Sequence, residues 1–316
     1  GLLTSALSKS APTTLWFEES QERWLEDFAQ EFSLSGVPRR ALRLTGGISG
    51  DSNPTGLEVL PHQFALSNLG LPTLLACHDL HPFTVPWKYD DAAIWQQRLR
   101  HAVSGAGAVL TQFPHTYRTL EEQTGLAVPE LFLTPSPLML PMATVLSRRL
   151  VRASQSDSPG GGTRFIYPAQ FQLHKNHEIL VLAFAEHIRH FPKSRLVLPG
   201  TPGSEGWMEH IRDMVESTGI AQNTEMPGRL TEVALLEEFV QADVLVTPSF
   251  AEGGNYVGLE ALAGGLGLVA ADIPQSRAHL ASVGATARWF KAGSVPSLVE
   301  ALAASVEGGS QQFAEN

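Results

Sequence analysis

The sequence predicts an α/β protein built from two doubly wound, Rossmann-like domains that face each other across a cleft. Two observations support this fold class. Segments typical of strands alternate with segments typical of helices in both halves of the chain, and a polar, glycine-rich stretch, residues 154–163, separates the halves. Such alternation implies parallel sheets with right-handed crossovers. We therefore predict an N-terminal domain over residues 1–150, a linker over 151–162 and a C-terminal domain over 163–316.

The individual elements follow from short apolar runs, which read as strands, and from the segments between them, which read as helices. In the first half we expect strands at residues 13–18, 41–44, 73–77, 108–111 and 131–134, and helices at 21–32, 92–103 and 116–124. In the second half we expect strands at residues 163–167, 195–198, 244–247 and 268–271, and helices at 177–189, 207–217, 232–241 and 259–264. Ligands of such sheets bind beyond the carboxyl ends of the strands, so polar residues that follow a strand are site candidates.

Composition excludes several classes of protein. With 43% hydrophobic and 17% charged residues, the chain is expected to be a soluble globular protein, and no run approaches the roughly 20 apolar residues of a membrane span. Gly1–Thr4 shows no signal pattern. A first strand with its glycine loop is not evident before Leu15, as expected if residues are missing upstream.

Charge and cysteine usage narrow the partners and the compartment. The net charge is −10, with 11 basic and 14 acidic residues in 1–150 and 11 and 18 in 151–316, so neither half suits nucleic acid, and membrane contact is at most peripheral. Cys77 is the single cysteine, which rules out an intrachain disulfide and a cysteine zinc cluster. We expect a cytoplasmic protein in which Cys77 is a small buried residue.

The most informative motif spans residues 248–262 and holds two carboxylates, Glu252 and Glu260, with seven residues between them. A buried strand is expected to stop at Pro248, followed by a glycine turn and a helix whose first turn carries Glu260. Free backbone N–H groups and the positive end of the helix dipole would make this an anion site. The alternative is an ordinary strand, turn and helix with two solvated glutamates.

This segment resembles the second domain of retaining glycosyltransferases with the GT-B fold, glycosyltransferase family 4, also called glycosyl transferases group 1. The shared pattern is Pro-Ser, then Glu-Gly, then Leu-Glu-Ala. The resemblance implies that Glu260 binds the ribose of a nucleotide sugar and that Glu252 contacts the donor sugar near the reacting carbon. Gly253 and Gly254 would permit close approach of the backbone to a phosphate. The donor-binding loop continues through Asn255 and Tyr256, where the sequence departs from the family's usual Phe-Gly-Leu-Pro and leaves the donor's identity open.

A second motif places Lys175 just before the helix that follows the first strand of the C-terminal domain. A lysine at a helix N-terminus has no favourable interaction with the dipole, so a bound anion such as diphosphate would explain it. The resemblance implies that Lys175 binds the donor diphosphate and stabilises it as leaving group. The family's usual arginine six residues earlier is Ala169 here, and Arg229 is a candidate contributor near the nucleotide. The alternative for Lys175 is a solvated surface lysine.

Two flanking residues have simpler interpretations. Asn176 is expected to cap the following helix, and His177 to lie exposed in its first turn.

A third motif ends the expected strand 73–77 with His78 and Asp79. The residue after a parallel strand faces the ligand, and the resemblance implies that His78 contacts donor sugar or acceptor. The alternative is a structural histidine that Asp79 holds by a hydrogen bond. The loop 82–91, with Trp87 and Lys88, has the composition of a carbohydrate-facing surface and equally that of a packed lid.

Together these motifs predict a metal-independent hexosyltransferase without a cofactor. It would move a sugar from a GDP- or UDP-sugar to a glycan, lipid-linked or other hydroxyl acceptor. The Asp-x-Asp pattern of metal-using enzymes is not found. Two readings from other classes remain open, a non-catalytic GT-B subunit and a nucleotide-sugar epimerase.

Overall fold

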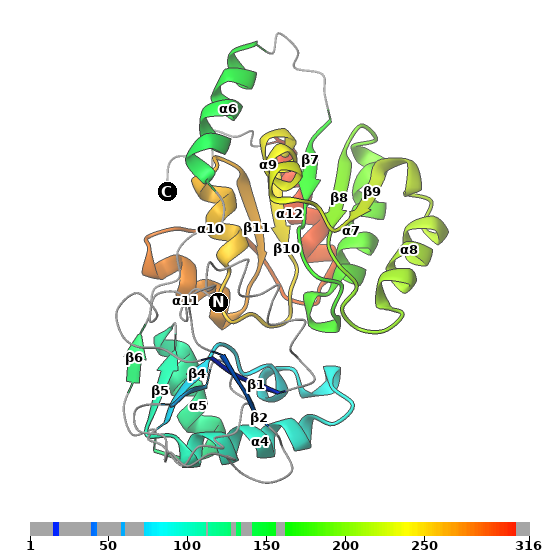
Figure 1. The fold of residues 1–316 in the computed structure, drawn as a ribbon. Coiled ribbons are helices and arrows are strands. Elements are labelled where there is room, and N and C mark those ends of the chain that lie inside the picture. Colours follow the sequence, from blue (N-terminus) through cyan, green and yellow to red (C-terminus); the bar gives the residue numbers. More distant parts are fainter. Residues whose placement is uncertain are drawn as a thin grey trace. The chain divides into compact units, whose positions relative to one another are not determined.

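The computed structural model describes residues 15–18, 39–42, 58–60, 73–111, 113–127, 131–133, 141–155 and 162–307 (Figure 1). The chain divides into two compact units, Gly1–Glu58 with Leu66–Thr73, and Val59–Ala65 with Leu74–Asn316. In the smaller unit, β1 (Leu15–Glu18) pairs in parallel with β2 (Arg39–Leu42). The helix expected at residues 21–32 lies outside the described residues. The predicted domain limits at 150 and 163 stay a prediction.

A four-stranded sheet has the order β3-β4-β5-β6, and its pairs β4–β5 and β5–β6 are parallel. Its strands are β3 (Glu58–Leu60), β4 (Thr73–Cys77), β5 (Ala108–Thr111) and β6 (Leu131–Leu133). The helices that follow β4 and β5 are α3 (His81–Thr84), η2 (Pro86–Lys88), α4 (Ala92–Gly105) and α5 (Pro114–Thr124). Leu75, Leu99 and Leu120 are fully buried between β4, α4 and α5, and Cys77 is buried there as expected.

A six-stranded parallel sheet has the order β12-β11-β10-β7-β8-β9. In chain order its strands are β7 (Arg164–Ile166), β8 (Arg195–Pro199), β9 (Thr224–Gly228), β10 (Val244–Thr247), β11 (Gly267–Ala271) and β12 (Arg288–Phe290). Its helices are α6 (Met142–Gln155), α7 (His177–His190), α8 (Trp207–Ser217), α9 (Glu232–Gln241), α10 (Tyr256–Ala263), α11 (Pro274–Ser282) and α12 (Val295–Glu307). This is the strand order of a doubly wound fold, so the predicted fold class is confirmed.

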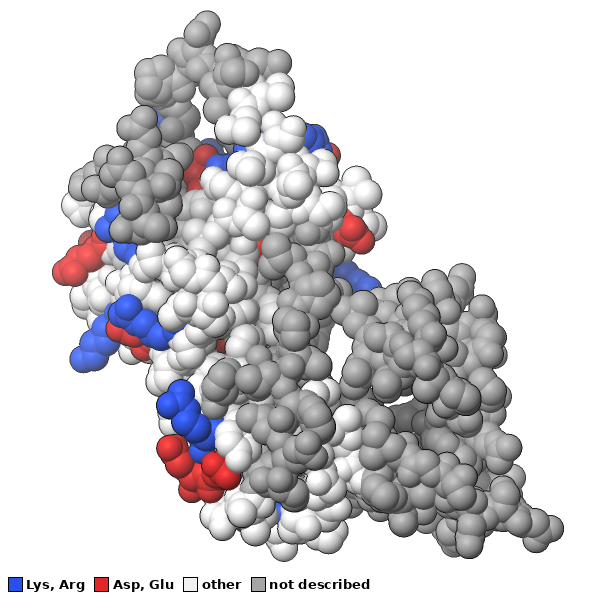
Figure 2. Space-filling model, turned by 90° about the vertical axis from the view of Figure 1, so that its left-hand side faces the viewer, with Lys and Arg blue, Asp and Glu red and all other residues white. Residues whose placement is uncertain are grey.

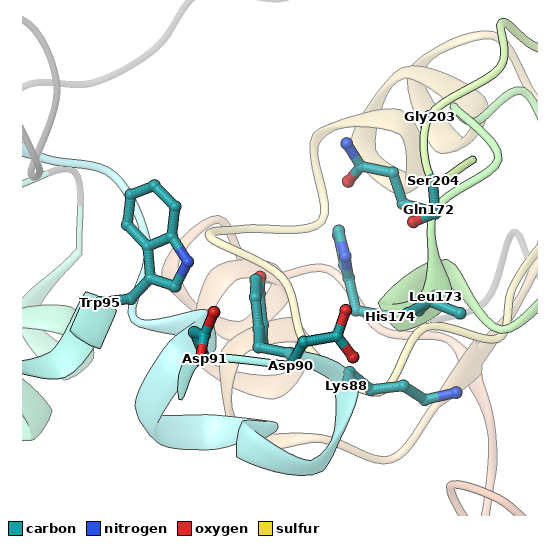
Figure 3. Close-up of a pocket in the computed structure, with 10 residues that line it drawn as sticks. Lys88, Asp90, Asp91, Trp95, Gln172, Leu173, His174, Gly203 and Ser204 are labelled. Atoms are coloured by element: carbon teal, nitrogen blue, oxygen red, sulfur yellow. The ribbon is translucent and has the colours of Figure 1, made fainter. Parts of the chain in front are cut away.

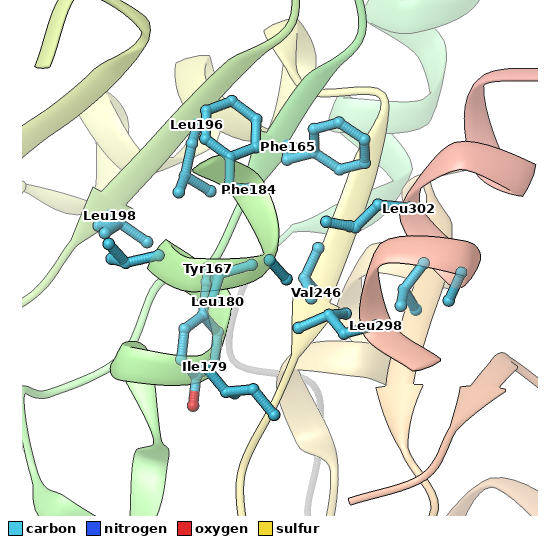
Figure 4. Packing of buried hydrophobic residues seen from close by; sticks show 14 of the residues in the cluster. Phe165, Tyr167, Ile179, Leu180, Phe184, Leu196, Leu198, Val246, Leu298 and Leu302 are labelled. Atoms are coloured by element: carbon cyan, nitrogen blue, oxygen red, sulfur yellow. The ribbon is translucent and has the colours of Figure 1, made fainter. Parts of the chain in front are cut away.

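Side chains of the central strands alternate between two apolar clusters, one on each face of the sheet. Phe165 of β7 and Leu196 of β8 pack with α7 and α12, as Figure 4 shows for Phe184 and Leu302. Ile166, the residue after Phe165 on β7, packs on the opposite face with α6, α9, α10 and α11. Successive side chains of a strand point to opposite faces, so continuous apolar runs such as that of β10 require helices on both sides.

The unpredicted strands of the second sheet, β9 and β12, lie at its two edges. β9 reads Thr-Glu-Met-Pro-Gly, and only alternate residues are covered, so the apolar run that marks a buried strand is missing. Sequence reasoning also missed α6, α11 and α12. In addition, α3 and η2 occupy much of the segment expected to be a loop, and α10 begins three residues earlier than expected, at Tyr256.

Candidate active site

The candidate site lies at the carboxyl ends of β7 and β10, which are neighbours in the sheet. From this pair the strand order runs outward in opposite directions, through β8 and β9 on one side and β11 and β12 on the other. Ligands of open α/β sheets bind at such a switch point. Lys175 follows β7 at the end of the short helix η3 (Leu173–Lys175), and Glu252 follows β10. The topology therefore brings together two residues that stand 77 positions apart.

Lys175 and Glu252 form a bidentate ion pair. The Lys175 Nζ atom donates to both carboxylate oxygens of Glu252, each at 2.8 Å. The two side chains are only 22% and 13% exposed. The interpretation of Lys175 as a solvated surface lysine, and of Glu252 as a solvated glutamate, is therefore wrong.

Two buried hydroxyl groups, which the sequence reasoning missed, support this pair through hydrogen bonds. Ser249 donates from Oγ to Oε1 of Glu252 at 2.6 Å, and the Tyr167 hydroxyl lies 2.9 Å from the same Ser249 oxygen. Tyr167 also contacts the backbone carbonyl of Lys175 at 3.1 Å. Burial, and then the charge of Glu252, raise the pKa of Tyr167 well above its usual value, so it stays a neutral donor. A tyrosine at the end of an apolar strand needs a buried partner, and that was the available signal.

Asn176 and His177 differ from expectation. Asn176 has a left-handed backbone (φ 54°), its side chain makes no cap hydrogen bond, and its Nδ2 atom instead donates to the Pro248 carbonyl at 3.2 Å. This bond ties the loops after β7 and β10 together. His177 is fully buried and stacks on Phe171 with ring centroids 4.4 Å apart, so its expected exposure is wrong. Burial, and then Lys175, lower the pKa of His177 to about 3.

Gly253 and Gly254 each sit where a side chain would collide. A Cβ atom on Gly253 would lie 2.6 Å from the backbone carbonyl oxygen of His78, and one on Gly254 would lie 2.4 Å from the Phe113 ring. Close approach of protein atoms is thus one reason for these glycines, beside the expected approach of a phosphate. The structure brings the backbone of His78, whose side chain is exposed, next to Gly253 in the loop of Glu252. Asp79 pairs with His81, its Oδ1 atom accepting from the His81 backbone N–H at 3.2 Å.

The remaining predicted donor residues lie on or near α10 and β9. The Asn255 side chain caps α10, its Oδ1 accepting from the Gly258 N–H at 3.0 Å while its Nδ2 donates to Thr247 Oγ1 at 3.0 Å. The side chain is buried and hydrogen-bonded at both ends, so it fixes the start of α10, and its expected contact with a donor stays a prediction. Glu260 is buried in the second turn of α10 instead of the first. Arg229 is exposed directly after β9.

Tyr256, the first residue of α10, packs its ring against its neighbours. The ring centroids lie 4.6 Å from His279 and 5.8 Å from Phe113. This contact orients the start of α10 beside Gly254.

A pocket of about 460 Å³ opens beside η3 within the larger compact unit. Figure 3 shows Trp95 on one side, Gln172 and His174 on the other, and the carboxylates of Asp90 and Asp91 between them. The other residues lining the pocket are Lys88, Tyr89, Leu173, Gly203 and Ser204. The volume and the mixture of one indole with several hydrogen-bonding groups suit a small polar ligand.

Histidine rings meet at the wall of this pocket. His174 packs on His81 with ring centroids 4.3 Å apart. Burial, followed by the neighbouring His81, lowers the pKa of His174 to about 2, and burial also lowers the pKa of His81. Both rings are therefore neutral near pH 7, and the nearby cations are Lys175, which lies close to His174, and Lys88, which lines the pocket. Lys88 lies with its Nζ atom over the rings of Phe250 and Trp207, at 5.0 and 5.8 Å.

In the described part of the chain, no group of three or more His, Cys, Asp or Glu side chains is arranged to hold a metal ion, and metal independence stays a prediction. None of the helices in that part has the length and hydropathy that crossing a bilayer requires. On the face drawn in Figure 2, Lys and Arg side chains lie close to Asp and Glu side chains and do not form one basic patch.

The sequence of residues 152–316, just over half of the chain, matches the model of the family described as glycosyl transferases group 1. The chain belongs to this family. The match covers β7 through α12, and thus includes Lys175, Glu252 and Glu260. No curated protein matches the chain in sequence.

Several solved structures are similar in fold to this chain. Sucrose-phosphate synthase from Thermosynechococcus elongatus has a TM-score of 0.61 at 19% identity, over 76% of this chain and 60% of that one. A variant of TarM from S. aureus, in complex with UDP among other ligands, has a TM-score of 0.58 at 10% identity, over 79% of this chain and 48% of that one. HepE from Anabaena, in complex with UDP and glucose, has a TM-score of 0.71 at 14% identity, over 99% of this chain and 89% of that one.

At these identities the likeness shows the fold, which is the GT-B arrangement of α/β domains. This chain spans about half to three-fifths of the length of the first two proteins.

Proposed function

We propose that this chain is a retaining glycosyltransferase of glycosyltransferase family 4, and that it moves a hexose from a nucleotide-diphosphate sugar to a hydroxyl acceptor. The observation that supports this most is the meeting of Lys175 and Glu252 at the switch point of a doubly wound sheet, within the segment that matches the family. The UDP complexes of HepE and TarM favour UDP over GDP as the nucleotide.

Each residue then has a role in the reaction. Negative charge grows on the leaving diphosphate as the bond to the anomeric carbon breaks, and the Lys175 ammonium with the backbone of Gly253 and Gly254 would stabilise it. Glu260 would bind the ribose, and Arg229 would contribute near the nucleotide. Glu252 would hold the donor sugar, and His78, beside Gly253, would contact sugar or acceptor.

The reaction needs neither a metal nor a cofactor in this scheme, because Lys175 and the backbone N–H groups would counter the charge of the leaving diphosphate. It needs no strong protein base, because the departing phosphate can itself take the acceptor's proton when attack and departure share one face. The pocket lined by Trp95, Asp90, Asp91 and Gln172 is our candidate for the acceptor. Indole faces and carboxylates of this kind suit a glycan or the sugar of a lipid-linked acceptor. The proposed cytoplasmic location rests on the single cysteine.

The test is to incubate the whole chain with a panel of UDP- and GDP-sugars, with EDTA present, and to assay released nucleotide and the anomeric configuration of the product. Release with retained configuration in EDTA supports the proposal. Binding of nucleotide sugars without release from any of them would favour a non-catalytic GT-B subunit, and an altered sugar still attached to nucleotide would favour an epimerase.

A further inference from the structure

Lys175 and Glu252 bind each other in this structure, although their proposed roles give them different ligands, the diphosphate and the donor sugar. An ammonium group has three N–H donors, and in this structure two of them are directed at Glu252 at 2.8 Å. A diphosphate needs the same cation. The carboxylate of the protein and the phosphate of the ligand are therefore competitors for one side chain.

We infer that this pair is a latch, in which the donor's diphosphate displaces Glu252 from Lys175 and so frees the carboxylate for the donor sugar. The inference rests on the proposed function, since it takes a nucleoside diphosphate as the ligand of Lys175. A ligand shifts such an equilibrium only by its differential affinity for the two arrangements. The diphosphate has that difference, because it gains the ammonium only when the pair is open.

Lysine is suited to this exchange. Its charge sits at the end of a flexible four-carbon stem, so it can turn from one anion to another without movement of the backbone. The backbone around it is fixed by other contacts, since the Tyr167 hydroxyl contacts its carbonyl and Asn176 is bonded to the Pro248 carbonyl.

Glu252 would keep its place after the exchange. Its Oε1 atom also accepts from Ser249 at 2.6 Å, and Ser249 is held by Tyr167 at 2.9 Å. Opening the pair therefore frees Oε2 completely while Oε1 stays anchored. Ser249 and Tyr167 are positioning residues that present one carboxylate oxygen to a sugar hydroxyl after the diphosphate has bound.

The test is a double-mutant cycle on the affinity of the whole chain for UDP, measured by calorimetry. Glu252→Gln keeps the shape of the side chain and removes its charge, so we expect UDP to bind roughly tenfold more tightly, because a charge-assisted bond no longer competes. Lys175→Met lowers the affinity. In the Lys175→Met background, Glu252→Gln gives no gain. Glu237→Gln, which breaks the exposed pair with Arg148, is the matched control and leaves the affinity unchanged.

Each other outcome has a distinct meaning. A gain from Glu252→Gln that persists without Lys175 is through-space repulsion and overturns the latch. No gain, with a loss in Lys175→Met, also overturns the latch but leaves the proposed function intact. Failure of every folded variant and of the parent to bind UDP or GDP contradicts the proposed function and the latch together.

The ion pair can be tested without any nucleotide. The free amine of a lysine attacks the acyl carbon of an acylating reagent and displaces its leaving group, so mass spectrometry of the labelled protein reports how far Lys175 is engaged. We expect labelling of Lys175 to be several-fold faster in Glu252→Gln than in the parent or in Glu237→Gln. Equal rates in all three proteins mean that the pair is not formed in solution, and overturn the latch.

Discussion

Two neighbouring regions of the six-stranded sheet are held together in different ways: its interior, and the edge formed by the carboxyl ends of β7 and β10. In the interior, fully buried side chains such as Phe165, Phe184 and Leu196 interlock by shape. At the edge, Lys175 and Glu252 are held by charge and hydrogen bonds. Tyr167 belongs to both regions, because its ring packs in the cluster while its hydroxyl points beyond it (Figure 4). The interior depends on matching volumes, whereas the contacts of the charged pair depend on the groups that its atoms meet, which is why the latch is proposed there and not in the interior.

The largest effect on stability is expected in the interior. Phe184→Ala should lower the free energy of unfolding by about 3–5 kcal/mol, because it removes a fully buried ring that lies near Phe165 and His187. Urea denaturation measures this. Leu182→Ala on the same helix is the control, since that side chain is 42% exposed and should change stability by less than about 0.5 kcal/mol. Equal losses in the two variants would mean that α7 is not packed as described.

The largest effect on turnover is expected at the edge. Lys175→Met should lower the rate of sugar transfer roughly 10²- to 10³-fold, as loss of a preorganised transition-state contact does. The free energy of unfolding should change far less than the activation free energy of transfer does, because Glu252 keeps its hydrogen bond to Ser249. Lys291→Met, at an exposed lysine, is the control. A normally folded Lys175→Met protein that transfers at the parent rate would remove Lys175 from the proposed mechanism.

A smaller effect is expected from the second carboxylate, Glu260, which is buried on α10. Glu260→Ala should weaken UDP binding by about 1–3 kcal/mol, the loss of hydrogen bonds from a charged group to ribose. The control is Glu232→Ala, an exposed acid in the first turn of α9. Calorimetry that gives the parent affinity for Glu260→Ala would show that this residue is a structural carboxylate.

The last prediction concerns acid stability. His177 has a pKa of about 3 when folded and about 6.5 when unfolded. Between these values only the unfolded chain binds the proton, so the free energy of unfolding falls as pH falls from about 6.5 towards 3, by up to about 1.4 kcal/mol per pH unit. His177→Phe keeps the stack on Phe171 and should flatten the slope by that amount. Urea denaturation between pH 7 and 4 measures it, and an unchanged slope would contradict the burial of an ionisable ring.

The sequence alone determined the central strands and the candidate residues. Continuous apolar runs predicted β4, β5 and β10 with their observed limits, because a strand covered on both faces leaves a local signal. The order of Lys175, Glu252 and Glu260 within a recognisable family pattern was likewise readable. Edge strands β9 and β12 were not, because half-covered strands lack an apolar run.

Only the tertiary structure decided which residues are partners. The sequence does not show that Lys175 and Glu252 form an ion pair, or that Ser249 and Tyr167 make hydrogen bonds beside it. Nor does it show that the Asn255 side chain caps α10. The order of strands in the sheet fixes these contacts, since it places the ends of β7 and β10 side by side although the two charged residues stand 77 positions apart. Local patterns reflect burial over a few residues, whereas a hydrogen bond between distant residues exists only once the chain has closed the sheet between them.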